Sequence, residues 1–182
     1  MNTYKKFCGL NIDREAIGLG KSEYDVEYFC TPVGAEVIGY EGVGGIHYCF
    51  IPGFGDVVFA VNPMPVVDEY VYPLASDFED FLSLIISCNS TAAVEQIIGW
   101  DRREIFDNYI MPTEDECYFE RKRIFKYIKE VLNIKPIDDP YGYVRDLQKD
   151  FPYEKILFSD EYYDCTGRER FQKKDMCKGM NL

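Results

Sequence analysis

Lysine and arginine are missing from an 80-residue stretch of this 182-residue chain, Ser22 to Asp101. The stretch contains 13 of the 32 aspartates and glutamates, so its formal charge is −13, whereas the rest of the chain sums to +1. Nucleic-acid binding releases phosphate counterions through lysine and arginine, and anionic membranes attract the same residues. The charge therefore argues against nucleic-acid and membrane partners. It favours a basic protein partner, or it serves solubility alone.

The chain also lacks the features of exported and membrane proteins. No apolar run of about 7–15 residues follows the basic start, Met1 to Lys6, and no run approaches the roughly 18 apolar residues of a membrane span. The seven cysteines are an odd number without a CxxC pair, and several lie in apolar runs. Such cysteines are typical of free thiols in a reducing compartment. We therefore expect a cytoplasmic protein.

Motifs for catalysis and for cofactors are scarce. Glu15 stands where a P-loop ending in Gly20-Lys21-Ser22 needs its first glycine, and serine-nucleophile motifs are absent. The single histidine, His47, lies in a predicted strand, where a packed or hydrogen-bonded ring is expected rather than a metal ligand. We assign no catalytic residue, cofactor or metal and expect no enzyme. The alternative is an enzyme with an unrecognised cysteine site or a carboxylate pair of Glu41 and Asp56 at strand ends.

Apolar residues make up 47% of the chain and aromatic residues 16%, which is enough for a core rich in rings. Residues 35–40, 45–51 and 56–61 are rich in β-branched and aromatic residues and are separated by glycine turns. A shorter strand over residues 69–72 is expected to end before Pro73. This order predicts an antiparallel meander. The second and third runs are apolar on both faces, so we expect both faces of the sheet to be covered.

Helix signals surround these strands. Residues 1–33 are predicted to be loops with at most one short helix near residues 13–17. Ser76 and Glu79 form a capping box before an apolar stripe, which predicts a helix lying on the sheet. Further helices are expected over residues 92–98, 102–110 after the cap Asp101, 114–132 after the capping pair Thr113 and Glu116, and from Asp139-Pro140 through Leu147.

In the helix over residues 114–132, Ile124, Ile128, Val131 and Leu132 are expected to face inward. Residues 153–182 are predicted to form an extended tail that carries tyrosines. The fold class is therefore α+β: a mostly antiparallel sheet flanked by helices, with a helical C-terminal extension.

Three local patterns resemble the SUKH superfamily of Smi/Knr-type proteins. They are Ile38-Gly-Tyr40 through Gly44-Gly-Ile-His-Tyr48, then Asp56 to Val61, then Leu74-Ala-Ser-Asp-Phe78-Glu-Asp-Phe81-Leu82. The resemblance covers residues 34–89 and implies an α+β fold without a catalytic constellation. Many bacterial members are immunity proteins that neutralise a toxin domain, often a nuclease, and fungal members are regulatory scaffolds in cell-wall synthesis. The helical opening of the family, with its Leu-Pro pair, is not recognisable in residues 1–33.

We expect a SUKH-like α+β domain over residues 1–111 and, packed on it as one structural unit, a helical C-terminal extension and tail over residues 112–182. The leading hypothesis is a cytoplasmic, non-enzymatic module that binds another protein: an immunity protein that neutralises a basic, nuclease-type toxin domain. The alternative in the same class is a regulatory adaptor, and the oligomeric state is left open. Acidic and aromatic residues in turns of the acidic stretch are the candidate partner contacts: Glu41, Phe54, Asp56, Asp68, Glu69 and Tyr70.

Overall fold

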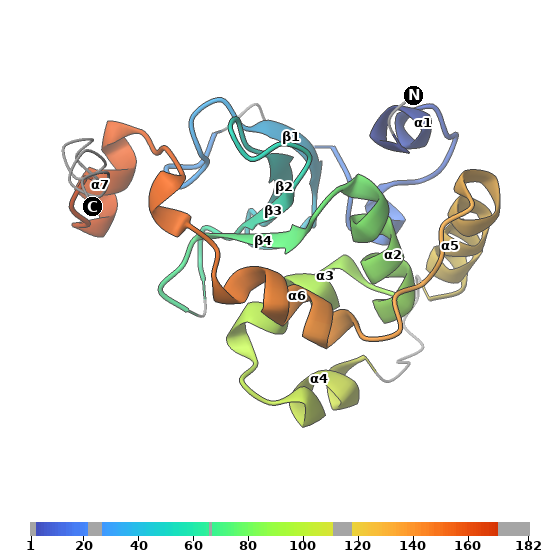
Figure 1. The fold of residues 1–182 in the computed structure, drawn as a ribbon. Helices are drawn as coiled ribbons and strands as arrows, with labels where there is room; N and C mark the ends of the chain where they lie inside the picture. The colour runs from blue at the N-terminus through green and yellow to red at the C-terminus, as the bar shows by residue number, and fades with distance from the viewer. Residues whose placement is uncertain (1–2, 22–26, 66, 111–117, 171–182) are drawn as a thin grey trace, which may run out of the picture.

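A four-stranded antiparallel sheet forms the centre of the computed structural model, which describes residues 3–21, 27–65, 67–110 and 118–170. Each strand pairs with the next one in the chain: β1 (Glu36–Tyr40), β2 (His47–Phe50), β3 (Val58–Val61) and β4 (Val71–Ala75). The predicted meander is confirmed, and the surrounding helices make the fold α+β (Figure 1). Glycines with positive φ lie in the first two turns of the meander: Gly42, Gly44 and Gly45 between β1 and β2, and Gly53 and Gly55 between β2 and β3.

The last strand, β4, differs from the prediction because it begins later and runs through Pro73. β4 is an edge strand of the four, where a proline costs least since only one side of the strand is paired. Pro73 lies opposite Phe59, next to a shift of register. Its carbonyl accepts a hydrogen bond from Gln148 Nε2 at 3.1 Å. Helix α6 (Pro140–Lys149) therefore covers this edge.

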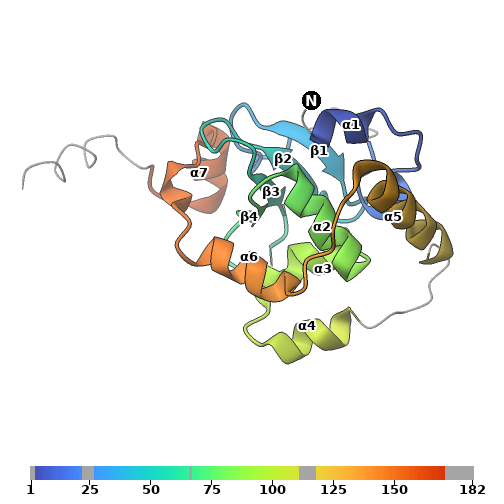
Figure 2. The same cartoon turned by 45° about the vertical axis from the view of Figure 1, so that its right-hand side comes forward.

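Helices cover one face of the sheet (Figure 2). α2 (Phe78–Cys88) presents the predicted apolar stripe to the core, but Asp77 rather than Ser76 caps it, by accepting a hydrogen bond from the Asp80 backbone N–H at 2.9 Å. Around it lie the 3-10 helix η1 (Glu15–Ile17), which confirms the predicted short helix, and α1 (Thr3–Cys8), which the sequence did not indicate.

The remaining helices on this side are α3 (Thr91–Glu95), the 3-10 helix η2 (Gln96–Gly99), α4 (Arg103–Tyr109) and α5 (Tyr118–Leu132). Two expectations about them are wrong. The cap residue of α4 is Arg102, without a side-chain hydrogen bond, instead of Asp101. On α5, Ile124 and Ile128 are buried as predicted, whereas Val131 is 51% exposed. The expected start of α5, with Thr113 and Glu116, lies outside the described residues.

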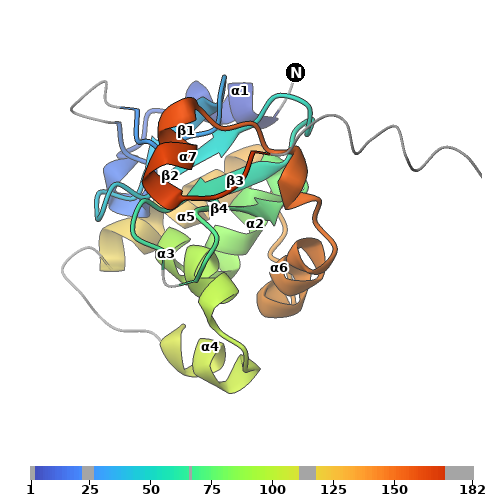
Figure 3. The same cartoon turned by 90° about the vertical axis from the view of Figure 1, so that its left-hand side faces the viewer.

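The opposite face of the sheet is covered by the C-terminal segment, which over residues 153–170 is not the extended tail that we predicted. The rest of that predicted tail, residues 171–182, lies outside the described residues. After α6 the chain forms the 3-10 helix η3 (Tyr153–Lys155) and then α7 (Asp160–Thr166), which lies over the strands in Figure 3. Ile156 and Tyr162 pack there with Cys49 of β2 and Phe59 of β3. The expectation that both faces are covered is therefore confirmed.

Within the described ranges, no single helix combines the length and the apolar composition needed to cross a membrane. Two consecutive helical segments, Phe78–Cys88 and Thr91–Gly99, reach that length and apolar composition only when they are counted together, and the chain bends by 108° between them.

Candidate partner-binding site

The sheet separates the six candidate partner contacts into two groups. In an antiparallel meander the first and third connections lie at one end, and the second lies at the other end. Glu41 therefore shares an end with the three residues Asp68 to Tyr70, whereas Phe54 and Asp56 lie in the β2–β3 hairpin at the far end. The hypothesis that Glu41 and Asp56 form a carboxylate pair is consequently wrong.

Glu41 is half-buried and lines a recess beside β1, so it does not lie on an exposed surface. Its carboxylate accepts a hydrogen bond from the Tyr48 hydroxyl, and Thr91 contributes a second one. Burial raises the pKa of Glu41 to about 7, and the nearby charge of Glu95 acts in the same direction. Glu95 is itself buried and accepts a hydrogen bond from Tyr72. These side chains form a buried acid network between the sheet and α3.

At the far end of the sheet, Phe54 and Asp56 differ in exposure. The Phe54 ring is half-buried and packs against Phe59 and Phe151, with ring centroids 5.4 and 5.3 Å apart. Asp56 is exposed in the hairpin. Phe54 thus joins the β2–β3 hairpin to the C-terminal segment, and Asp56 is the member of the pair that faces solvent.

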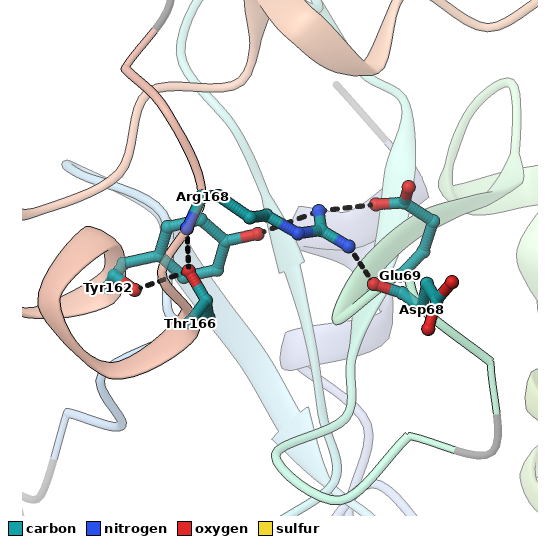
Figure 4. Close-up of polar contacts among 5 residues, drawn as sticks. All are labelled: Asp68, Glu69, Tyr162, Thr166 and Arg168. Carbon is teal, nitrogen blue, oxygen red and sulfur yellow. Dashed lines mark hydrogen bonds and ion pairs between the residues drawn. The ribbon is translucent and has the colours of Figure 1, made fainter.

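Arg168, which follows α7, occupies the end of the sheet where Asp68 and Glu69 lie (Figure 4). Its Nη1 atom donates hydrogen bonds to Glu69 Oε2 at 3.1 Å and to the Tyr162 hydroxyl at 3.0 Å. Its Nη2 atom donates to the backbone carbonyl of Asp68, and its guanidinium carbon lies 6.0 Å from the centre of the Tyr70 ring. Three candidate residues therefore surround one guanidinium group of the same chain.

The arginine lies in a cavity of about 250 Å³ that we call the acidic pocket. The described residues that line it include three carboxylates, those of Glu69, Glu154 and Glu169, and one cation, Arg168. Aromatic rings complete the wall, among them Tyr153 and Tyr163. Glu154 and Glu169 are exposed at its rim. The arrangement can hold a cation between carboxylates and ring faces.

Sequence reasoning missed the part of this pocket that comes from the C-terminal segment, because that segment was expected to be extended. A local signal for α7 is present in the sequence. Ser159 is its N-cap and accepts a hydrogen bond from the Tyr162 backbone N–H at 3.4 Å, two acids follow in the first turn, and Gly167 ends the helix with a φ of 67°.

Three of the cysteines and the histidine that an enzyme of the alternative class could use are buried, whereas Cys8 and Cys165 are exposed. Burial raises the pKa values of Cys30, Cys49 and Cys88 to about 12, so these thiols are poor nucleophiles. Burial lowers the pKa of His47, whose ring hydrogen-bonds with Thr31 and with the Gly45 carbonyl. His47 is thus the packed, hydrogen-bonded ring that the sequence predicts. Within the part of the chain that the structure describes, no three metal-binding side chains gather at one point.

Comparison of the chain with protein-family models, with curated proteins and with solved structures finds no match.

Proposed function

We propose that this protein is a non-enzymatic, cytoplasmic binding module of the SUKH type, an immunity protein that neutralises a basic toxin domain. The observation that carries the proposal is the position of Arg168 in the acidic pocket. A guanidinium group needs several acceptors in a matched arrangement, and here Glu69, a backbone carbonyl and the Tyr162 hydroxyl supply them, with the Tyr70 ring beside them. A surface that binds an arginine of its own chain offers the same chemistry to an arginine or lysine of a partner.

The charge balance supports this function. Among its described residues the acidic pocket has three carboxylates and one guanidinium group, and the exposed side chain of Asp68 lies beside Glu69. The described lining of the pocket thus stays negative with Arg168 in place. Exposed charges at the rim of an interface mainly accelerate association with a partner of opposite charge. Nucleases hold phosphate with lysine and arginine, so a nuclease-type domain presents a suitable basic surface.

The test is affinity capture from a lysate of the native host with the full chain immobilised, washed through a salt series. We expect one basic protein at equimolar amounts, with an association rate that falls as salt rises. Glu154→Lys with Glu169→Lys should lower that rate at low salt by about tenfold. The matched control is Asp101→Lys with Glu104→Lys, which makes the same charge change at exposed positions near α4 and should change the rate far less.

A growth assay then separates an immunity protein from an adaptor. The captured partner expressed alone should stop cell growth, and co-expression of the wild-type chain should restore it. Several weak partners that are insensitive to salt would favour a regulatory adaptor instead. Capture of no basic partner, or an equal loss with both pairs of substitutions, would overturn the proposed function.

A further inference from the structure

A second recess in the molecule has the opposite charge. It lies between α5, α4 and the junction of α2 with α3, encloses about 1060 Å³, and we call it the basic groove. Five cations line it: Arg121, Lys122, Arg123, Lys126 and Lys129. None of the described residues that line the groove is an aspartate or a glutamate, but Glu120 and Glu130 of the same helix pair with Arg123 at 2.6 Å and with Lys126 at 4.0 Å. In Figures 1 and 2, α5 and α7 lie on opposite sides of the sheet, so the basic groove is distant from the acidic pocket.

The groove combines this basic lining with apolar and aromatic surface. Ile86 of α2 and Ile110, which follows α4, contribute partly exposed apolar surface, and Ala93 of α3 and Phe125 of α5 lie buried behind it. Phe119 is 70% exposed and Tyr109 is 45% exposed, whereas most of the described aromatic side chains are buried or half-buried. Contiguous apolar surface rimmed by polar residues marks a binding site more often than isolated exposed rings do.

We propose that the basic groove binds a short acidic peptide segment of another protein, with carboxylates toward the cations and apolar side chains toward the lining. Its volume lies at the upper limit of small-ligand pockets, about 300–1,000 Å³, so it suits a peptide better than a metabolite. A long nucleic acid would extend beyond the groove and meet the acidic remainder of the chain, which repels phosphate. A peptide can end within the groove.

The length of α5 sets the length of the probe. Its 15 residues span roughly 22 Å, so a helical peptide of about 12 residues can follow most of it. We would titrate the full chain with four labelled peptides of this length, whose compositions are Glu/Leu, Glu/Ser, Gln/Leu and Lys/Leu. A single-stranded RNA with the same charge as the Glu/Leu peptide is the fifth ligand. Fluorescence anisotropy gives the affinities. Amide chemical shifts of the wild-type protein locate the bound peptide without any substitution.

Only the Glu/Leu peptide should bind, and it should shift amide signals of Ile86, Ala93 and Phe125. Lys122→Glu with Lys126→Glu should weaken binding at least about tenfold. The control, Lys149→Glu with Lys155→Glu, makes the same charge change at exposed positions outside the groove and should leave the affinity within about twofold. The proposal is overturned if the Glu/Leu peptide does not bind, if the Glu/Ser peptide or RNA binds equally well, or if both variants lose affinity equally.

Discussion

Tyr48 reaches from the middle of β2 into the core and donates its hydroxyl hydrogen to the carboxylate of Glu41, in the turn after β1. Tyr48 is fully buried, and Glu41 is half-buried. Glu95 lies close enough to add a second negative charge to the same region. An ionised Glu41 therefore loses hydration that two hydrogen bonds replace only in part, and the folded protein favours its neutral form.

Replacing Glu41 with glutamine should change how the stability of the protein depends on pH. The folded state raises the pKa of Glu41 from its ordinary value of 4.5 to about 7, so the folded protein binds the proton more tightly than the unfolded chain. The binding of this proton stabilises the folded protein. That contribution to the free energy of unfolding is fully present below pH 4.5 and is lost as the pH rises through about 7. At about 1.4 kcal/mol for each tenfold difference in proton affinity, the loss is about 3 kcal/mol.

Urea unfolding at pH values from 4 to 8 measures this difference between the wild type and Glu41→Gln. The glutamine keeps an acceptor for Tyr48 but cannot ionise, so its advantage over the wild type should grow across the window. Asp56→Asn removes an exposed carboxylate and is the matched control. A constant difference between wild type and Glu41→Gln at all pH values would contradict the burial argument.

Gly39 is needed where β1 passes the backbone of Leu19. A Cβ atom added at Gly39 would lie 2.8 Å from Leu19 Cα, and backbone atoms cannot move aside as a flexible side chain can. Gly39→Ala should therefore destabilise the protein by about 1–3 kcal/mol, as overpacking does in other cores. Gly9→Ala is the control, because its nearest contact is an ordinary 3.4 Å. Equal unfolding midpoints for the two variants in denaturant would argue against this close approach.

Local pattern was sufficient to predict the meander and several helices. The strands show alternation and glycine turns, and Asp139-Pro140 starts α6 as expected, with Asp139 accepting a hydrogen bond from the Gly142 backbone N–H at 2.9 Å. The predicted N-cap residue of α2, Ser76, was wrong because Ser76 and Asp77 are both good capping residues. Tertiary structure decides between them, since Ser76 hydrogen-bonds with Tyr143 of α6.

The candidate site was harder to predict, because distant contacts decide which acids are exposed. Glu41 is an acid in a turn by sequence, yet Thr91 and Tyr48, which follow later in the chain, bury it. The acidic pocket depends on Arg168, which is separated from Glu69 by 99 residues. Periodicity contains no information about such contacts. The apolar second face of the sheet did require a cover, but it did not indicate which segment supplies it.

Asp139 has two separable roles that substitutions can distinguish. It caps α6, and its carboxylate oxygens accept hydrogen bonds from Arg103 Nη2 at 2.5 and 2.6 Å. Asp139→Ala removes both roles and should cost about 1–2 kcal/mol. Arg103→Ala keeps the cap and removes only the half-exposed ion pair and the contact of the guanidinium with the Tyr141 ring, so it should cost less than Asp139→Ala. Unfolding monitored by the fluorescence of Trp100 gives both values. Equal losses would mean that the cap contributes nothing.

Arg168 and Glu69 should stabilise the C-terminal segment locally. Their side chains are about one-third exposed, with relative accessibilities of 36% and 37%, so solvent screens the ion pair. A double-mutant cycle with Arg168→Gln and Glu69→Gln should therefore give a coupling energy of only about 0.5–1 kcal/mol. The hydrogen bonds of Arg168 to Tyr162 and to the Asp68 carbonyl are lost as well in Arg168→Gln, so that single variant should cost more than Glu69→Gln.

Hydrogen exchange shows where this stability acts. Since α7 covers the sheet through Tyr162 and the adjacent Arg168, Arg168→Gln should speed exchange of amides in α7 far more than in β2 or β3. Glu69→Gln should produce a smaller change at the same amides. If exchange accelerated equally in α7 and in the central strands, the ion pair would stabilise the whole fold, and the C-terminal segment would unfold only together with the sheet.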